Sequence, residues 1–260
     1  MTEELEVKLD KATSLLVAAN YVVGLTGAGV SVESGLSTYR GPGGLWTRYG
    51  EPPMDRYQRF LKDPKGWWEE RRQPRSDERS KAMTKRLNAK PNPSHYALVE
   101  LETLGILKAL ITQNTDNLHR RAGSKNLLEI HGNGTLMRCI SCNARFHREK
   151  FEIKEIPPKC PNCGGIVKSD GVMFGEPIPT DVLERCQIEV ARCDLMLIAG
   201  TSAVVYPTAS FPMLARENGA TLIEVNPYAT TLSNVCDVVL QGPSGKILPF
   251  LVEKIKEKVH

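Results

Sequence analysis

Apolar residues along this chain fall into short runs of strand length, separated by stretches with helical spacing. Residues 5–19 carry apolar side chains at helical intervals, and the β-rich run 21–25 follows directly. Similar apolar runs recur at residues 108–112, 127–130, 195–199, 221–225 and 238–240. Helical stretches such as 94–104 and 208–218 lie between them. This alternation predicts an α/β fold with a Rossmann-like parallel sheet of buried strands covered by helices.

Glycine and small polar residues follow the predicted strands. These motifs are Gly27-Ala28-Gly29-Val30-Ser31, Gln113-Asn114-Thr115-Asp116, His131-Gly132, Gly200-Thr201-Ser202 and Asn226-Pro227. In an open α/β sheet the carboxyl ends of the strands share one edge, where exposed backbone donors bind ligands. The five motifs therefore predict one binding site at that edge.

Two stretches interrupt the alternation, and we expect them to form a smaller domain. Residues 39–87 are rich in Trp, Arg and Pro and predict a helical module, whereas residues 135–170 contain paired cysteines. The predicted Rossmann-like domain is discontinuous and comprises residues 1–38, 88–134 and 171–260. A cleft between the two domains would hold the substrate.

Four cysteines have the spacing of a zinc ribbon, C-x2-C-x17-C-x2-C. They are Cys139, Cys142, Cys160 and Cys163. Paired C-x2-C motifs fit tetrahedral thiolate ligation of zinc better than two disulfides. Because four thiolates leave no open position for water, the spacing predicts a structural ion.

Composition indicates a soluble protein with no membrane span. The 260 residues are 41% hydrophobic, and the acidic start Met1-Thr2-Glu3-Glu4 does not resemble a signal peptide. We expect a cytoplasmic location. The net charge of +4 is small, and the basic residues between Arg56 and Lys90 are interspersed with acidic ones. This pattern favours a solvated helical surface over direct nucleic-acid binding.

The residues of the predicted edge also allow structural interpretations. Gly27-Ala28-Gly29 could cradle a pyrophosphate or form a plain tight turn, and Val32 stands where the usual dinucleotide fingerprint has its third glycine. A hydride-transfer enzyme is therefore disfavoured. His131 could act as a general base, although a histidine at a strand end is more often structural. Asn114 and Asp116 could orient a sugar or an amide, or cap a helix.

Taken in order, these motifs closely resemble those of the sirtuins from one end of the chain to the other. The resemblance also includes Glu33-Ser34-Gly35, Asn117-Leu118-His119 and Phe174-Gly175-Glu176. Sirtuins are NAD-dependent protein lysine deacylases, so the resemblance implies an NAD site between the two domains, beside an acylated lysine. It also implies release of nicotinamide and transfer of the acyl group from lysine to ADP-ribose.

The resemblance implies a role for each site residue. His131 matches the general base that deprotonates a ribose hydroxyl. Asn114 would orient the ribose and a water, Asp116 would hold the nicotinamide carboxamide, and Gln113 would touch the ribose. The remaining cofactor-binding positions are Gly27, Ala28, Gly29, Ser31, Tyr39, Arg40, Gly200, Thr201, Ser202 and Asn226. Positions on the peptide and acyl-lysine side are Val172, Phe174, Gly175 and Val204, with Trp68 and Arg71 as candidates for reading the acyl chain.

The acyl chain is the main point left open by the resemblance. Ser37-Thr38-Tyr39-Arg40 and Gly43-Gly44-Leu45-Trp46 are closest to a prokaryotic and mitochondrial branch that includes desuccinylases and demalonylases. Those enzymes use a Tyr-x-x-Arg pair, whose nearest counterpart here is Trp68 with Arg71. Because Trp lacks the phenol, deacetylation is the first interpretation and removal of acidic or longer acyl groups the second.

Two other functions use the same features differently. A protein mono-ADP-ribosyltransferase would share the NAD site, and a nucleic-acid-binding module would use the ribbon and the segment 56–90 beside a degenerate core. The expected partners are acylated-lysine proteins or peptides, chromatin proteins among the possibilities.

Overall fold

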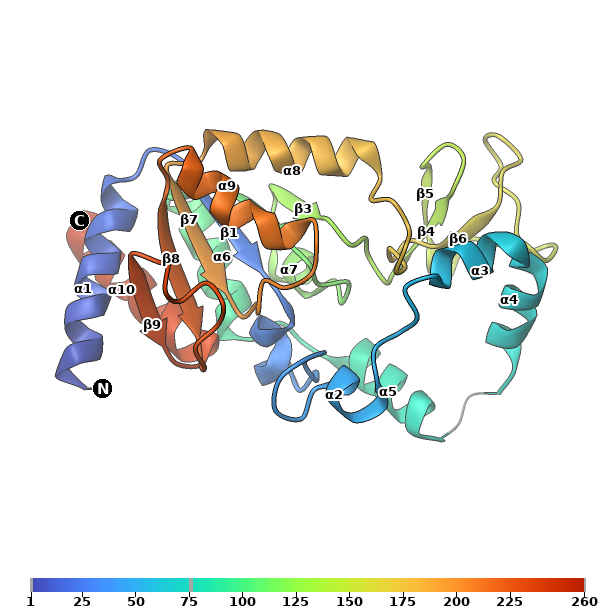
Figure 1. The fold of residues 1–260 in the computed structure, drawn as a ribbon, viewed down its shortest axis with the longest axis horizontal. Helices are drawn as coiled ribbons and strands as arrows, with labels where there is room; N and C mark the ends of the chain where they lie inside the picture. Colours follow the sequence, from blue (N-terminus) through green and yellow to red (C-terminus); the bar gives the residue numbers. More distant parts are fainter. Residues whose placement is uncertain (1, 75–76, 260) are drawn as a thin grey trace.

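A six-stranded parallel sheet forms the centre of the structure, a computed structural model that describes residues 2–74 and 77–259. Its strands are β1 (Val22–Thr26), β2 (Leu107–Thr112), β3 (Leu127–Glu129), β7 (Leu195–Ala199), β8 (Thr221–Asn226) and β9 (Val238–Gln241). Their order is β3-β2-β1-β7-β8-β9, and all neighbours are parallel (Figure 1). The predicted Rossmann-like α/β fold is confirmed.

The strand order reverses between β1 and β7. From β1 the chain builds outward to β2 and β3, and after a long excursion it returns to β7 on the other side and continues to β8 and β9. In open α/β sheets, ligands bind in the crevice outside the carboxyl ends at such a reversal. We therefore expect the binding site at the carboxyl ends of β1 and β7.

Helices cover both faces of the sheet. One face packs against α1 (Glu3–Ala18), α6 (Pro93–Thr103) and α10 (Ser244–Val259), and the other against α8 (Thr180–Arg192) and α9 (Phe211–Glu217). Side chains alternate accordingly, since Val22 belongs to the first core, whereas Val23 and Leu25 belong to the second. Shorter helices complete this part: η1 (Ala28–Ser34), α7 (Leu118–Ala122) and η3 (Thr208–Ser210).

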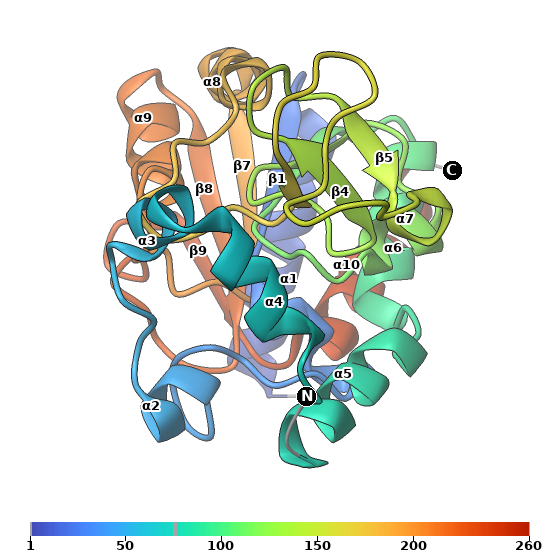
Figure 2. The same ribbon diagram turned by 90° about the vertical axis from the view of Figure 1, so that its right-hand side faces the viewer.

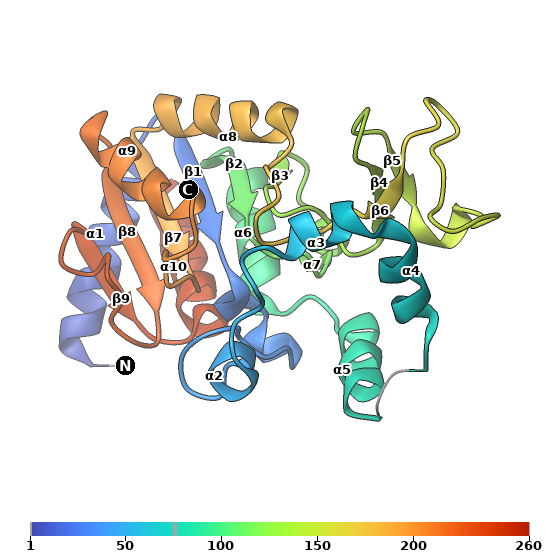
Figure 3. The same ribbon diagram turned by 45° about the vertical axis from the view of Figure 1, so that its right-hand side comes forward.

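A three-stranded antiparallel sheet lies to one side of the large sheet (Figures 1 and 3). It consists of β4 (Leu136–Cys139), β5 (Arg145–His147) and β6 (Val167–Ser169), in the order β5-β4-β6, and η2 (Arg148–Lys150) follows β5. The helices of the first interruption are α2 (Leu45–Tyr49), α3 (Arg56–Lys62), α4 (Pro64–Arg72) and α5 (Asp77–Asn88). Figure 2 shows α3 and α4 crossing in front of the large sheet.

The two interruptions pack against each other through a small apolar core. Trp68 of α4 contacts a cluster with Met137, Cys139, Cys160 and Val167 of the ribbon. The contact between the stretches 39–87 and 135–170 agrees with a single smaller domain. The exact residue limits of this domain stay a prediction. The basic segment 56–90 includes residues 75 and 76, which lie outside the described residues. Within the described ranges, the helices are too short or too polar to span a bilayer.

Candidate active site

A cleft of about 2000 Å³ runs along the carboxyl edge of the large sheet and reaches the smaller sheet. Most of the predicted site residues line it. They are Gly27, Ala28, Gly29, Tyr39, Arg40, Arg71, Gln113, Asn114, His131, Val172, Phe174, Gly175, Gly200, Thr201, Ser202, Val204 and Asn226. Motifs that are far apart in the sequence therefore share one cavity.

Glycines allow the turn after β1 to touch the turn after β7. The Gly29 amide donates to the Gly200 carbonyl over 2.8 Å. A Cβ atom on Gly29 would lie 2.6 Å from the Gly200 Cα, and Gly200 itself has φ +59°, which disfavours any side chain. The result is a bare backbone surface at the strand reversal, the kind of surface that a pyrophosphate can approach closely.

Asn114 connects the turn after β1 with the turn after β2. Its amide Nδ2 donates to the Gly27 carbonyl over 3.0 Å and to the Ser31 hydroxyl over 3.2 Å. Ser31 in turn donates to Asp116 Oδ2 over 2.7 Å, and the Leu118 amide donates to Asp116 Oδ1. Ser31 thus lies one hydrogen bond behind Asn114 of the cleft wall, and Asp116 lies two hydrogen bonds behind it.

Thr201 joins two further motifs. Gln113 Nε2 donates to the Thr201 hydroxyl over 2.8 Å, and Asn226 Nδ2 donates to the Thr201 carbonyl over 2.8 Å. These bonds cross the strand reversal and hold three strand-end turns in a fixed relation. The side chains of Gln113, Thr201 and Asn226 thus line one cleft, whereas Asp116 also accepts from the Leu118 amide at the start of α7.

His131 is held in one tautomer at the cleft wall. Its Nδ1 atom lies 3.2 Å from the Gln113 carbonyl oxygen, which can only accept, so Nδ1 carries the proton. Nε2 then carries an unprotonated lone pair, and the Thr208 hydroxyl lies 3.5 Å from it. Burial lowers the pKa of the imidazole below its ordinary value, although the bond to Gln113 opposes this effect. A neutral imidazole with an unprotonated Nε2 is suited to act as a general base.

This lowered pKa predicts how activity depends on pH. Burial disfavours the charged form, so His131 stays neutral until the pH falls through a value below the ordinary histidine pKa of about 6.5. We expect the acidic limb of the pH profile of kcat to lie below that value. Peptide deacylation measured by chromatography at saturating substrates checks this expectation, and a limb at or above the ordinary value would contradict it.

An aromatic contact that sequence reasoning missed connects the two sides of the cleft. The Trp46 ring lies 4.9 Å from the Tyr39 ring and 5.3 Å from the Phe174 ring, between centroids. Arg40 stacks over Trp46 at 4.8 Å and pairs with Glu51 at 2.8 Å. The run Gly43-Gly44-Leu45-Trp46 signalled a shared motif, but nothing in it identified Phe174 as the partner.

The structure places Trp68 away from the cleft, contrary to its proposed role in reading the acyl chain. Its indole N–H donates to the Val167 carbonyl over 3.2 Å, and its ring is buried in the ribbon core. Trp67 lines the cleft instead, and the Arg71 guanidinium lies 4.4 Å above its ring. Adjacent residues of a helix point about 100° apart, so only one of the two can face the cleft.

The four ribbon cysteines form a site that fits a zinc ion. Their sulfur atoms all lie within 4.8 Å of one another, with Cys139 and Cys163 at 3.5 Å and Cys142 and Cys160 at 3.7 Å. A tetrahedron with Zn–S bonds of about 2.3 Å requires sulfur separations of about 3.8 Å. The site is a closed set of four thiolates and therefore structural.

These features together define a class of dinucleotide-binding enzymes. They are a Rossmann-like sheet with a glycine turn at its strand reversal, a histidine in the cleft and an inserted zinc ribbon. The family model described as the Sir2 family matches residues 27–207. The chain belongs to the Sir2 family, which confirms the resemblance found in the sequence.

Named relatives and solved structures resemble nearly the whole chain. NAD-dependent protein deacylase 1 of Archaeoglobus fulgidus is 43% identical over 248 residues, covering 95% of this chain and 98% of the relative. NAD-dependent protein deacetylase of Sulfurisphaera tokodaii is 39% identical, covering 97% and 98%. A Sir2 homologue in complex with NAD superimposes with TM-score 0.78 at 42% identity, covering 96% and 95%. A Sir2 complex with a p53 peptide and NAD gives 0.75 at 30% identity, covering 96% and 98%.

Proposed function

We propose that this protein is an NAD-dependent protein lysine deacetylase that transfers the acetyl group to ADP-ribose and releases nicotinamide. The observation that carries the proposal is His131, which lines a cleft shared with the glycine turn and Asn114 and whose Nε2 is left unprotonated by the bond between Nδ1 and the Gln113 carbonyl. The relatives named as NAD-dependent deacylases and the Sir2 structures that contain NAD support the same function.

Each part of the cleft has a role in this reaction. The bare backbone at Gly27, Gly29 and Gly200 would hold the pyrophosphate of the substrate NAD. Asn114, positioned by Gly27 and Ser31, would orient the ribose hydroxyls and a water through hydrogen bonds. His131 would take a proton from the ribose hydroxyl once nicotinamide has left, which lets that hydroxyl attack the acyl carbon.

Asp116 and Ser31 do not line the cleft themselves and would contribute from behind Asn114. Ser31 donates to Asp116, so the carboxylate is already oriented. Our interpretation is that substrate binding brings the nicotinamide carboxamide within reach of Asp116, whose oxygens accept hydrogen bonds from an amide.

The peptide would enter beside segment 171–175 and Val204, which line the same cleft. An extended peptide that adds a strand to exposed backbone gains main-chain hydrogen bonds without demanding one sequence. The Sir2 complex with a p53 peptide supports a peptide substrate for this chain as well. Chromatin proteins are one source of such peptides. We place the protein in the cytoplasm because four cysteines are arranged as zinc ligands and the other three are unbridged thiols, which suits a reducing compartment.

We expect acetyl-lysine to be the preferred substrate over succinyl-lysine. Trp68 is turned into the ribbon core, and Arg71 stacks on Trp67, so the hydrogen-bonding pair that a terminal carboxylate needs is incomplete. Matched peptides carrying acetyl-, succinyl- or longer-chain acyl-lysine, assayed side by side with NAD, give the comparison through kcat/KM. A higher kcat/KM for succinyl-lysine would contradict the proposed acyl preference.

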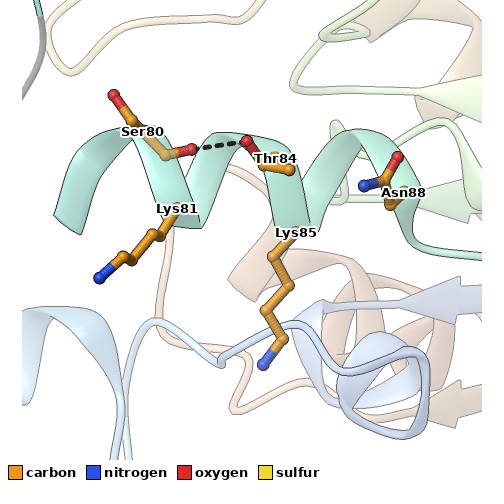
Figure 4. A pocket seen from close by; sticks show the side chains of 5 residues that line it. All are labelled: Ser80, Lys81, Thr84, Lys85 and Asn88. Atoms are coloured by element: carbon orange, nitrogen blue, oxygen red, sulfur yellow. Dashed lines mark hydrogen bonds between the residues drawn. The ribbon is translucent and has the colours of Figure 1, made fainter. Parts of the chain in front are cut away.

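The same assay separates the competing functions. Formation of 2′-O-acyl-ADP-ribose in step with free lysine identifies deacylation, whereas ADP-ribose attached to protein identifies a mono-ADP-ribosyltransferase. The nucleic-acid-binding alternative would use the segment 56–90. Within it, a groove on α5 is lined by two lysines, Lys81 and Lys85, and by the neutral side chains of Ser80, Thr84 and Asn88 (Figure 4). Salt-sensitive DNA binding without deacylation would favour this alternative.

A further inference from the structure

Four charged side chains are buried together where the smaller sheet meets the cleft. Arg138, Lys168, Asp170 and Glu176 are each at most 9% exposed. Two carry positive and two carry negative charge, and we call them the buried ion cluster. Because an unpaired buried charge is strongly destabilising, the four groups are stable only as a set.

Glu176 lies at the centre of the buried ion cluster. Its Oε2 atom is 3.0 Å from Lys168 Nζ, and its Oε1 atom accepts from the Arg138 guanidinium. Arg138 Nε lies 3.2 Å from Asp170 Oδ1. Arg138 belongs to β4 and Lys168 to β6, so Glu176 connects two strands of the ribbon sheet.

The same side chains hold segment 171–175 at its first residue and at its middle. In the middle of the segment, the Met173 amide donates to Glu176 Oε2 over 2.8 Å, which closes a turn over residues 173–176. Lys168 Nζ donates to the Gly171 carbonyl over 2.9 Å at the beginning. All five residues of the segment line the cleft. Its position therefore depends on Lys168 and Glu176.

The segment also contacts the backbone of the proposed general base. The Val172 amide donates to the His131 carbonyl over 2.9 Å, and the Asn133 amide donates to Asp170 Oδ2 over 2.7 Å. Gly132 has φ +77°, and a Cβ atom there would lie 2.3 Å from the Asp170 carbonyl oxygen. This close packing leaves little freedom between segment 171–175 and His131.

We propose that Glu176 is a positioning residue: through Lys168 and Arg138 it sets where segment 171–175 lies relative to His131, and so determines the affinity for the acylated peptide. This inference rests on the proposed function, in which the segment binds the peptide. The zinc ribbon then has a second role, since its strands supply the two cations that hold the peptide-binding segment.

Glu176→Gln tests the proposal, because the amide keeps the size of the side chain but removes the charge that faces Lys168. We expect KM for the acetylated peptide to rise about tenfold, the size of one lost charge-assisted hydrogen bond, while KM for NAD stays unchanged. A purely structural role predicts a lower melting temperature without this split between the two substrates. An unchanged peptide KM, or an equal rise in both KM values, would overturn the proposal.

Glu224→Gln is the matched control. Glu224 is fully buried in β8 of the large sheet and accepts from the hydroxyls of Thr230 and Ser233 rather than from Lys168 or Arg138. The same substitution at this equally buried carboxylate should leave the peptide KM unchanged. A rise in peptide KM for Glu224→Gln that equals the rise for Glu176→Gln would show that any buried charge loss has this effect, and would refute a positioning role.

Glu176→Asp provides a second test if the glutamine variant does not fold. The aspartate keeps the charge but is one methylene shorter, so the segment moves toward the cations while the charge balance is preserved. We expect the same selective rise in peptide KM, and an unchanged value would contradict the proposal. Failure of the proposed function is distinguishable, because the unmodified protein would then show no NAD-dependent release of acetyl groups.

Discussion

His131→Ala should reduce NAD-dependent deacetylation by on the order of 10²–10⁴-fold, the usual contribution of a general base. The physical reason is the tautomer that the Gln113 carbonyl imposes, which leaves Nε2 as the proton acceptor at the cleft wall. NAD affinity should be largely retained, because the proton transfer follows binding. Chromatographic turnover and calorimetric titration with NAD measure the two quantities separately.

His147→Ala is the control for this experiment. His147 is exposed at the end of β5, so removing its imidazole should leave turnover unchanged. Retained turnover in His131→Ala would refute the base assignment. Loss of NAD binding together with turnover would instead show that the imidazole mainly shapes the binding site.

Cys160→Ala should abolish zinc binding and unfold the ribbon. Its buried sulfur is one of four ligands, and zinc binding in small zinc domains contributes about 10–16 kcal/mol of folding free energy. Cys160 also belongs to the core around Trp68, so α4 should lose its packing surface. Metal content by atomic absorption and melting followed by tryptophan fluorescence measure both effects.

Deacetylation should be lost in the same variant, because β6 and β4 carry the cations that hold segment 171–175. Cys236→Ala is the control, since this half-buried cysteine lies outside the metal cluster. Its metal content and turnover should match those of the unmodified protein. Unchanged zinc content and an unchanged melting curve in Cys160→Ala would contradict the structural role of the site.

Local pattern was sufficient for most elements of the large sheet. The apolar run 195–199 coincides with β7, and the run 221–225 lies within β8 (Thr221–Asn226). The predicted helix 208–218 is divided into η3 and α9 instead. Pro212 lies in the first turn of α9, where the missing backbone N–H is tolerated, so the proline marks a helix start that spacing alone does not reveal.

The sequence by itself determined the element types, the metal-ligand spacing and the polar motif after each strand, because these depend on local periodicity and residue chemistry. Only the tertiary structure decided which motifs meet. It placed β7 beside β1, so that Gly29 touches Gly200, and it turned Trp67 rather than Trp68 toward the cleft. It also joined Glu176 to Lys168 and Arg138. Such contacts depend on strand order and packing between distant segments, and no local pattern along the chain encodes them.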